Sequence, residues 1–141
     1  MPTLEKAISI AIEAHEGDVD KAGSPYILHP LRVMFQMETE EEMIAAVLHD
    51  VLEDTAISPD QLKETGFSER VLEALDSVTK RAGEAYEDFV KRAASDPIGK
   101  KIKLADLRDN MDLSRLERIT DKDLERLKKY HNALKIIKEL F

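Results

Sequence analysis

The apolar residues of this chain recur with the period of an α-helix, and the alternation expected of a β-strand is nearly absent. In the segment LEKAISIAIEAH the apolar side chains fall at Leu4, Ala7, Ile8, Ala11 and Ile12. This i, i+3, i+4 spacing puts them on one face of a helix, which must be covered by another helix. The sequence therefore predicts an all-α fold whose core forms between facing apolar stripes.

Capping signals divide the pattern into about seven or eight helices within one compact domain spanning residues 1–141. Thr39 with Glu42 forms a T-x-x-E capping box. Ser58 before Pro59 starts another helix, and Gly66 ends it. The predicted helices lie at 4–15, 29–37, about 40–54, 59–65, 68–80, 85–94, 97 to about 116 and 121–140.

Composition excludes several classes of protein. The chain has 141 residues, of which 43% are hydrophobic and 35% charged, as expected for a globular domain rather than a disordered one. A net charge of −8 argues against a long nucleic-acid partner, and no apolar run reaches the roughly 20 residues of a membrane span. Without a recognisable signal peptide, we expect a cytoplasmic protein. Because the chain contains no cysteine, any metal must be held by nitrogen and oxygen ligands.

The segment AAVLHDVLEDT, residues 45–55, gathers four polar side chains: His49, Asp50, Glu53 and Asp54. On a continuous helix they share one arc, so they could be a solvated face or half of a metal site. Ala46 lies on the same arc and would leave room for a ligand. Adjacent helical residues diverge, so further metal ligands would have to come from elsewhere in the chain.

Two residues are the main candidates for those further ligands. His29, in SPYILHPLRVM, lies where a loop enters a helix, a place where a lone histidine is more often a core or capping residue than a ligand. Asp106, in IKLADLRDNMD, has apolar neighbours, which is costly for a carboxylate unless it is paired or metal-bound. Arg108 or Lys103 could supply a structural salt bridge instead. Asn110 follows Asp106 by one helical turn, on nearly the same face.

With the histidines and aspartates in this order, the sequence resembles the HD metal-dependent phosphohydrolase superfamily. More narrowly, it is similar to the hydrolase domain of the RelA/SpoT alarmone enzymes and their small single-domain relatives. The resemblance runs from about residue 4 to 116, through AHEGDVDKAGSPYILHP, AAVLHDVLEDT, VTK at 78–80 and IKLADLRDNM. It implies a compact helical HD-domain fold.

The resemblance also implies a divalent metal, usually Mn²⁺, and an adjacent acidic pair that activates water. The implied metal ligands are His29, His49, Asp50 and Asp106, and the implied acidic pair is Glu53 and Asp54. These residue types suit that chemistry: imidazoles and carboxylates accept a Mn²⁺-like ion, which lowers the pKa of water and polarises a phosphoryl oxygen. Glu53 is the better candidate for taking the proton, with Asp54 in support.

For the substrate, the resemblance points to a small nucleotide and to a guanosine 3′,5′-bis(diphosphate) 3′-pyrophosphohydrolase-like reaction. Asn110 matches a residue that contacts the ribose region, and Lys21 matches a basic residue near the substrate. Asp20, however, stands where alarmone hydrolases usually have an arginine that helps hold the guanine base. Three alternatives stay open: a phosphatase of another nucleotide or dinucleotide phosphomonoester, such as a 2′-phosphate; a non-catalytic nucleotide-binding sensor; and a helical interaction module.

Overall fold

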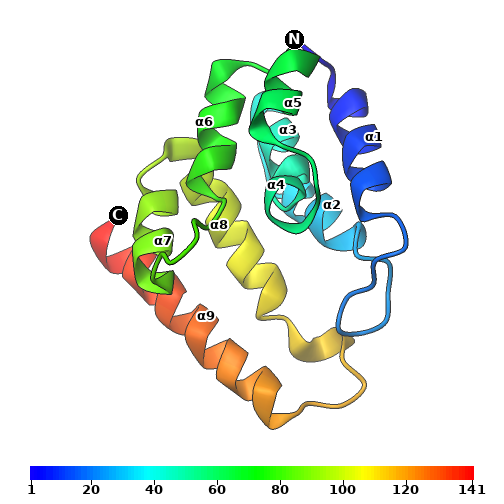
Figure 1. Cartoon of the computed structure of the whole chain (residues 1–141). Helices are drawn as coiled ribbons and strands as arrows, with labels where there is room; N and C mark the ends of the chain where they lie inside the picture. The colour runs from blue at the N-terminus through cyan, green and yellow to red at the C-terminus, as the bar shows by residue number, and fades with distance from the viewer.

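The computed structural model describes all residues from Met1 to Phe141 and confirms the all-α prediction (Figure 1). Nine α-helices and one short 3₁₀ helix follow one another along the chain: α1 (Leu4–His15), α2 (Leu28–Phe35), α3 (Glu40–Leu48), α4 (Val51–Asp54), α5 (Pro59–Thr65), α6 (Glu69–Ser77), α7 (Tyr86–Ala94), α8 (Pro97–Asn110), η1 (Leu113–Arg115) and α9 (Asp121–Leu140). The ninth α-helix arises because the segment predicted as one helix at about 40–54 is divided into α3 and α4.

The predicted helix boundaries at α3 and α5 are confirmed by their capping contacts. The Thr39 hydroxyl accepts from the Glu42 amide at 3.1 Å, and the Glu42 carboxylate accepts from the Thr39 amide at 3.0 Å. Ser58 caps α5 in the same reciprocal way with Gln61. Gly66 ends α5 with φ at +103°, in the left-handed region that glycine adopts without steric cost.

The helix predicted from 97 to about 116 is too long. α8 ends at Asn110, and only the three residues of η1 resume helical structure. Asp112 accepts hydrogen bonds from both the amide and the hydroxyl of Ser114, at 3.0 and 2.5 Å. Short polar side chains that bond to nearby backbone compete with helix formation in this way.

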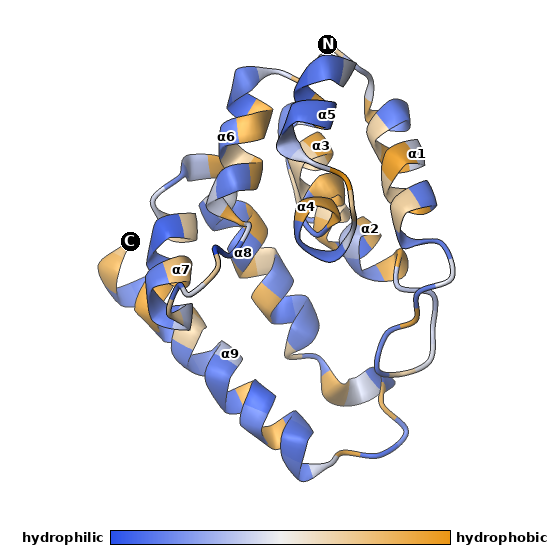
Figure 2. Ribbon diagram, viewed as in Figure 1, coloured by the Kyte–Doolittle hydropathy of each residue, from blue (hydrophilic) through white to orange (hydrophobic).

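Helix α3 occupies the middle of the larger hydrophobic core. It packs against α1, α2, α6 and α8, and its residues 44–48 are fully buried. Figure 2 shows this segment as a run of hydrophobic residues surrounded by helices that are polar on their outer faces. The predicted stripe of α1 faces this core through Ala7 and Ala11, whereas Ile12 is half exposed. Because residues 44–48 are buried on all sides, the C-terminal end of α3 lies in the interior of the protein.

A smaller core joins α7, α8 and α9. It is built from Val90, Ala94, Leu107, Ala133 and Ile137. Helix α8 therefore contacts both cores, with Ile102 and Ala105 in the larger one, and α9 runs along the outside of the molecule (Figure 1). None of the helices combines the length and the apolar character that crossing a membrane requires.

Gly99 allows α8 to lie close to α6 and α7. A Cβ atom at this position would be 2.1 Å from the Ser77 Oγ atom and 2.7 Å from the Ala93 carbonyl oxygen. Gly99→Ala is therefore expected to lower the free energy of unfolding by about 1–3 kcal/mol, because the helices must separate to admit the methyl group. Urea denaturation measures this loss, and Arg108→Ala, an exposed change on the same helix, is the control. Equal stability of the two variants would contradict the close approach.

Candidate metal centre

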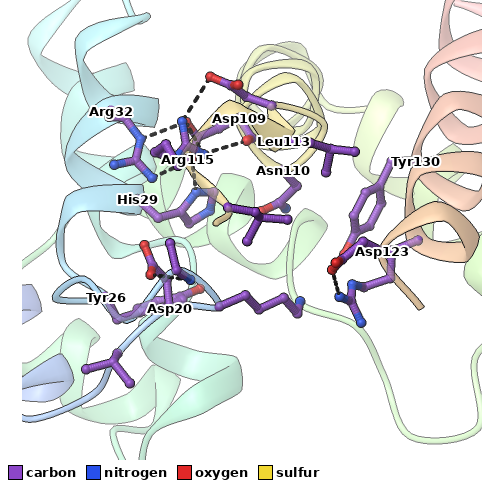
Figure 3. Close-up of a pocket in the computed structure, with 16 residues that line it drawn as sticks. Asp20, Tyr26, His29, Arg32, Asp109, Asn110, Leu113, Arg115, Asp123 and Tyr130 are labelled. Carbon is purple, nitrogen blue, oxygen red and sulfur yellow. Dashed lines mark hydrogen bonds and ion pairs between the residues drawn. The ribbon is translucent and has the colours of Figure 1, made fainter. Parts of the chain in front are cut away.

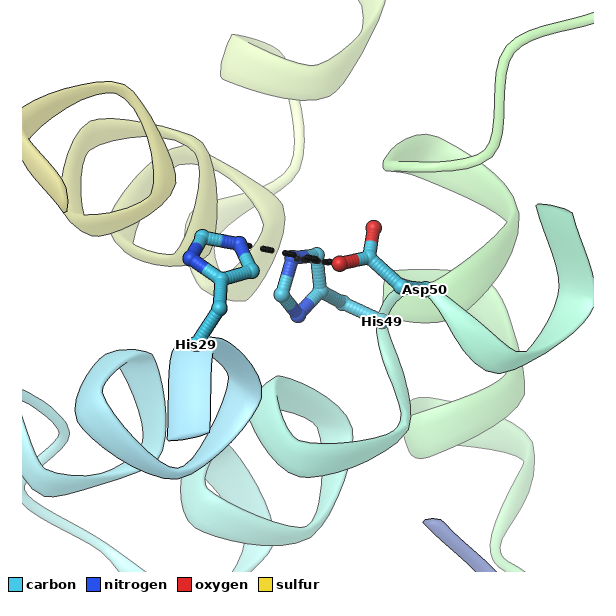
Figure 4. Close-up of side chains that lie close together, drawn as sticks. All are labelled: His29, His49 and Asp50. Atoms are coloured by element: carbon cyan, nitrogen blue, oxygen red, sulfur yellow. Dashed lines mark ion pairs between the residues drawn. The ribbon is translucent and has the colours of Figure 1, made fainter. Parts of the chain in front are cut away.

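Three segments far apart in the sequence meet at one point. His29 is the second residue of α2, His49 and Asp50 lie between α3 and α4, and Asp106 lies in α8. His29, His49 and Asp50 each offer a ligand atom within 4.8 Å of the others (Figure 4). The Asp106 Oδ1 atom lies 2.9 Å from the His29 Nε2 atom and 3.4 Å from the His49 Nε2 atom. The structure thus brings all four predicted metal ligands together.

The segment carrying His49 and Asp50 is not the continuous amphipathic helix predicted from the sequence. Helix α3 ends at Leu48, and the His49 amide donates to the Ala46 carbonyl, three residues earlier, at 3.2 Å. His49 is only 3% exposed, so a wet helix face is the wrong description of it. Ala46 is fully buried. His49 keeps helical dihedral angles, and Asp50, with φ −96° and ψ −7°, departs from the regular helix before α4 begins.

The hydrogen bonds of the two imidazoles fix which nitrogen each presents to the centre. The His49 Nδ1 atom lies 2.6 Å from the Ala46 carbonyl oxygen, which can only accept, so Nδ1 carries the proton. The His49 Nε2 atom is buried without a hydrogen-bond partner, 3.2 Å from Asp50 Oδ2 and 3.4 Å from Asp106 Oδ1, and in the neutral ring it carries a lone pair. An unpaired buried acceptor is costly, and a cation at the centre would satisfy it. Two imidazoles and two carboxylates around such an atom fit a divalent cation.

The centre is strongly anionic without a cation. Burial alone would lower the pKa of His29, but the Asp106 and Asp109 carboxylates raise that pKa to about 10. Burial would raise the pKa of Asp106, whereas the ammonium group of Lys103 and the two imidazoles hold it well below its usual range. Lys103 Nζ lies 3.3 Å from Asp106 Oδ2, so Lys103 supplies the salt bridge considered from the sequence, and the exposed Arg108 does not. Metal binding at such a site is expected to release a proton.

Two residues of the centre were missed from the sequence. The Tyr26 hydroxyl donates to Asp50 Oδ2 at 2.6 Å, and burial raises the pKa of Tyr26, so it remains a donor. Asp109 accepts from His29 Nδ1 at 2.6 Å. Tyr26 lies three residues before His29, and Asp109 lies three residues after Asp106. Proximity to a ligand in the sequence was the available signal in both cases.

Glu53 and Asp54 lie in α4, the short helix that begins directly after Asp50. Both line a cavity of about 260 Å³ together with the four candidate metal ligands. Partial burial, followed by the charge of Asp50, raises the pKa of each of these two carboxyls. A carboxylate with a raised pKa is a better proton acceptor once ionised, so both groups suit general-base chemistry in this cavity.

A second cavity of about 370 Å³ adjoins the first, and four residues line both: Tyr26, His29, Asn110 and Tyr130. Lys21 lines the second cavity and makes no ion pair. Burial lowers the pKa of Lys21, and the neighbouring positive charge of Arg126 adds to this effect. The Asn110 amide donates to Asp106 Oδ1 at 3.2 Å, as their spacing on one helix face predicted. Both predicted substrate residues therefore face cavity space beside the metal centre.

Helix α9 forms the far wall of the second cavity, opposite α2 and the loop before it. Asp123 and Tyr130 project from α9 toward His29 and Asp20 in Figure 3. No motif pointed to α9 as part of the site, because its sequence is that of an ordinary polar surface helix. Only its packing against α7 and α8 places these side chains at the cavity.

Asp20 organises its own loop. Its Oδ1 atom accepts from the amides of Ala22 and Ser24, both at 2.9 Å. Its carboxylate also lines the second cavity. The residue therefore brings a negative charge to a wall that also carries the positive charges of Lys21, Arg32 and Arg126.

Comparison with known proteins gives relatives along most of the chain. This chain is 36% identical over 120 residues to a protein of Aquifex aeolicus named guanosine-3′,5′-bis(diphosphate) 3′-pyrophosphohydrolase. The aligned residues cover 77% of this chain and 17% of the relative. A protein of Haemophilus influenzae with the same name is 45% identical over 75 residues, which cover 50% of this chain and 11% of the relative. The chain thus spans less than a fifth of the length of these two relatives.

A solved structure and a family model agree with the helical arrangement. The structure, described as "A metazoan ortholog of SpoT hydrolyzes ppGpp and plays a role in starvation responses", is 24% identical in sequence and matches with a TM-score of 0.79. The match covers 97% of this chain and 86% of that chain, so the two share a fold. The family model described as HD domain matches residues 7–119, which include every candidate metal ligand. The chain therefore belongs to the HD domain family.

Proposed function

We propose that this protein is a metal-dependent phosphohydrolase of a small nucleotide, with guanosine 3′,5′-bis(diphosphate) as the leading substrate and Mn²⁺ as the metal. The observation that carries the proposal is the convergence of four ligand groups around a buried, unpaired imidazole nitrogen of His49. The names of the Aquifex and Haemophilus relatives support the substrate. We propose His29, His49, Asp50 and Asp106 as the metal ligands.

The residues beside the centre suit attack by water at phosphorus. A divalent cation, when bound, makes water more acidic and neutralises charge on the phosphoryl oxygens. Glu53 would take the proton of the attacking water, and Asp54 would support it. Cleavage of the bond between phosphorus and the ribose 3′-oxygen then yields pyrophosphate and a nucleoside 5′-diphosphate. Lys80 and Lys129 line the cavity of about 260 Å³ that contains the four candidate metal ligands. Their positive charges would bind the negatively charged pyrophosphate.

The second cavity is suited to the nucleoside end of the substrate. It opens beside the metal centre and carries both the amide of Asn110 and the aromatic ring of Tyr130. An aromatic ring offers a stacking surface for a base, and an amide can bond a ribose hydroxyl. Lys21 would attract the 5′-phosphates. Bound in this way, the substrate would have its 3′-phosphates, rather than its base, next to the acidic pair.

An assay with purified protein tests the proposal directly. Guanosine 3′,5′-bis(diphosphate) should be turned over with Mn²⁺ and not with excess chelator, and the phosphorus product should be pyrophosphate. A panel of other nucleotides, including 2′- and 3′-phosphomonoesters, is run in parallel. Binding of nucleotide without turnover of any member would favour a sensor and contradict the proposed enzyme.

Asp20 favours a second candidate function, hydrolysis of a different nucleotide phosphomonoester such as a 2′-phosphate. The carboxylate occupies the place of a base-holding arginine, and its hydrogen bonds to Ala22 and Ser24 commit it to the loop. A carboxylate cannot stack on guanine as a guanidinium does. Orthophosphate release from a phosphomonoester, faster than pyrophosphate release from the guanosine substrate, would support this second candidate.

Replacing Asp20 with asparagine separates its charge from its role in the loop. Asparagine can still accept from both amides, because it forms the same side-chain turn as aspartate. Loss of the negative charge should lower the KM for an anionic nucleotide about fivefold, as about 1 kcal/mol of repulsion is removed, with kcat nearly unchanged. Steady-state kinetics at low ionic strength measure the effect. A KM equal to that of the wild type would mean that the phosphates lie away from this loop.

A further inference from the structure

On the side that faces away from the proposed metal centre, the imidazole of His29 contacts the carboxylate of Asp109, which has no role in the proposed function. His29 Nδ1 lies 2.6 Å from Asp109 Oδ2, while Nε2 faces Asp106 and Asp50 on the opposite side of the ring. An ionised carboxylate only accepts hydrogen bonds, so Nδ1 must donate. The contact therefore directs the Nε2 atom of His29 toward the proposed metal centre.

Asp109 is itself held by arginines. Arg32 donates to it through Nε and Nη2, at 2.7 and 3.1 Å, in the two-bond geometry that fixes a carboxylate most firmly. The Arg115 Nη2 atom lies 3.4 Å from Asp109 Oδ1 and donates to the Asp109 carbonyl oxygen at 2.9 Å. Figure 3 shows Asp109 enclosed between the two arginines and the His29 ring. The carboxylate is only 12% exposed, so water competes little for these bonds.

The two histidines of the centre are oriented by different kinds of group. His49 donates to a neutral backbone carbonyl, whereas His29 donates to a charged carboxylate. A carboxylate behind a histidine fixes its tautomer and makes the imidazole a stronger metal ligand. The arginines keep this carboxylate ionised and stop it from turning into the centre as a ligand. Asp109 thus has the position and the partners of a group that acts on a ligand rather than on the metal.

We propose that Asp109, clamped by Arg32, is a positioning residue that sets the orientation and metal affinity of His29. The inference rests on the proposed metal centre and adds a residue that acts through one of its ligands. It predicts that Asp109→Asn lowers Mn²⁺ affinity by about 10- to 100-fold, because the amide carries no charge and turns a donor toward the arginine. Arg32→Ala should cause a smaller loss, since Arg115 still contacts the carboxylate.

The chain offers a closely matched control in the ion pair between Arg70 and Asp96. Arg70 also binds an aspartate through two bonds, at 2.9 and 2.8 Å, and Asp96 lies at the start of the same helix α8. The arginines of the two pairs are 33% and 32% exposed, and the aspartates 12% and 16%. Asp96→Asn and Arg70→Ala therefore remove an equivalent pair that has no contact with either histidine.

The experiment measures Mn²⁺ binding to each full-length variant without nucleotide, by electron paramagnetic resonance and calorimetry, with circular dichroism as the check of folding. Turnover at rising Mn²⁺ concentration is the second measurement. A weakly binding but correctly folded enzyme should recover most of its kcat at saturating Mn²⁺, which a damaged fold would not do. If Asp109→Asn fails to fold, Arg32→Ala and the conservative Arg32→Lys carry the test.

Weakened Mn²⁺ binding in the Asp109 and Arg32 variants, with wild-type binding in the Asp96 and Arg70 controls, supports the proposal. Wild-type affinity in folded Asp109 and Arg32 variants overturns it and leaves the metal centre intact. Equal losses in the control pair also overturn it, because the effect would then come from general destabilisation. Absence of Mn²⁺ binding by the wild-type protein would overturn the metal centre itself, and this inference with it.

Discussion

Replacing Asp106 with asparagine is expected to lower turnover about a thousandfold while leaving the helices folded. Asp106 lies between the Nε2 atoms of both histidines, so its carboxylate is the part of the centre that links α8 to α2 and to the α3–α4 break. An amide is a far poorer ligand for a hard divalent cation. Loss of several kcal/mol of charge stabilisation in the transition state corresponds to this factor, at about 1.4 kcal/mol for each tenfold change.

The measurement is kcat with saturating Mn²⁺, together with metal content after dialysis. Asparagine has nearly the same volume as aspartate, so circular dichroism should show an unchanged helix content. Asp76→Asn, which changes a carboxylate that is 68% exposed and outside both cavities, is the control. Full activity of the Asp106 variant would remove this residue from the metal centre and would undermine the proposed hydrolase.

Glu53→Gln is expected to lower kcat by about 10²- to 10⁴-fold without loss of the metal. Glutamine fills the same space in α4, but it cannot take a proton from water, and general-base catalysis contributes a factor of this size. Glu53 shares the cavity of the metal centre and follows Asp50 by three residues, which places it beside the ligands without being one of the four that converge. Metal binding and proton transfer are therefore separable in this variant.

Two measurements distinguish the roles in the Glu53 variant. Calorimetry should show that the Glu53→Gln variant binds Mn²⁺ with the same affinity as the wild-type protein. Steady-state kinetics should show that the kcat of the variant is lowered, with little change in its KM. Glu73→Gln, at a side chain that is 63% exposed on α6, serves as the control. If Glu53→Gln turns over at the wild-type rate, proton transfer belongs to another group, and Asp54→Asn then becomes the decisive variant.

Several features of the fold follow from local sequence because their causes are local. The capping boxes at Thr39 and Ser58 involve residues three positions apart, and Gly66 ends α5 through its own backbone freedom. The C-terminal helix was predicted at 121–140 and is observed with the same bounds, and in the structure Thr120 caps its start together with Asp123. Between Asn110 and Ser114 the local signals conflict, and the helix predicted from 97 to about 116 extends beyond the observed end of α8 at Asn110.

The candidate site was predictable as a set of residue types and only in part as a geometry. The polar residues of AAVLHDVLEDT were placed on one arc of a continuous helix, as a solvated face or as half of a metal site, because a helical wheel assumes that the helix continues. In the structure, residues 44–48 of α3 are fully buried, and the His49 imidazole that follows them is buried as well. The participation of Asp109, Tyr26 and α9 followed no motif, since their roles come from contacts with distant segments.

By itself, then, the sequence determined the helical class, most helix ends and the supply of imidazoles and carboxylates in a recognisable order, because periodicity and capping act within a few residues. The tertiary structure decided which of these groups share one centre. His29 and Asp106 are 77 positions apart, and only the packing of α8 against α2 and α3 brings their side chains to 2.9 Å. Such distances depend on how whole helices fit together, and no spacing along the chain encodes them.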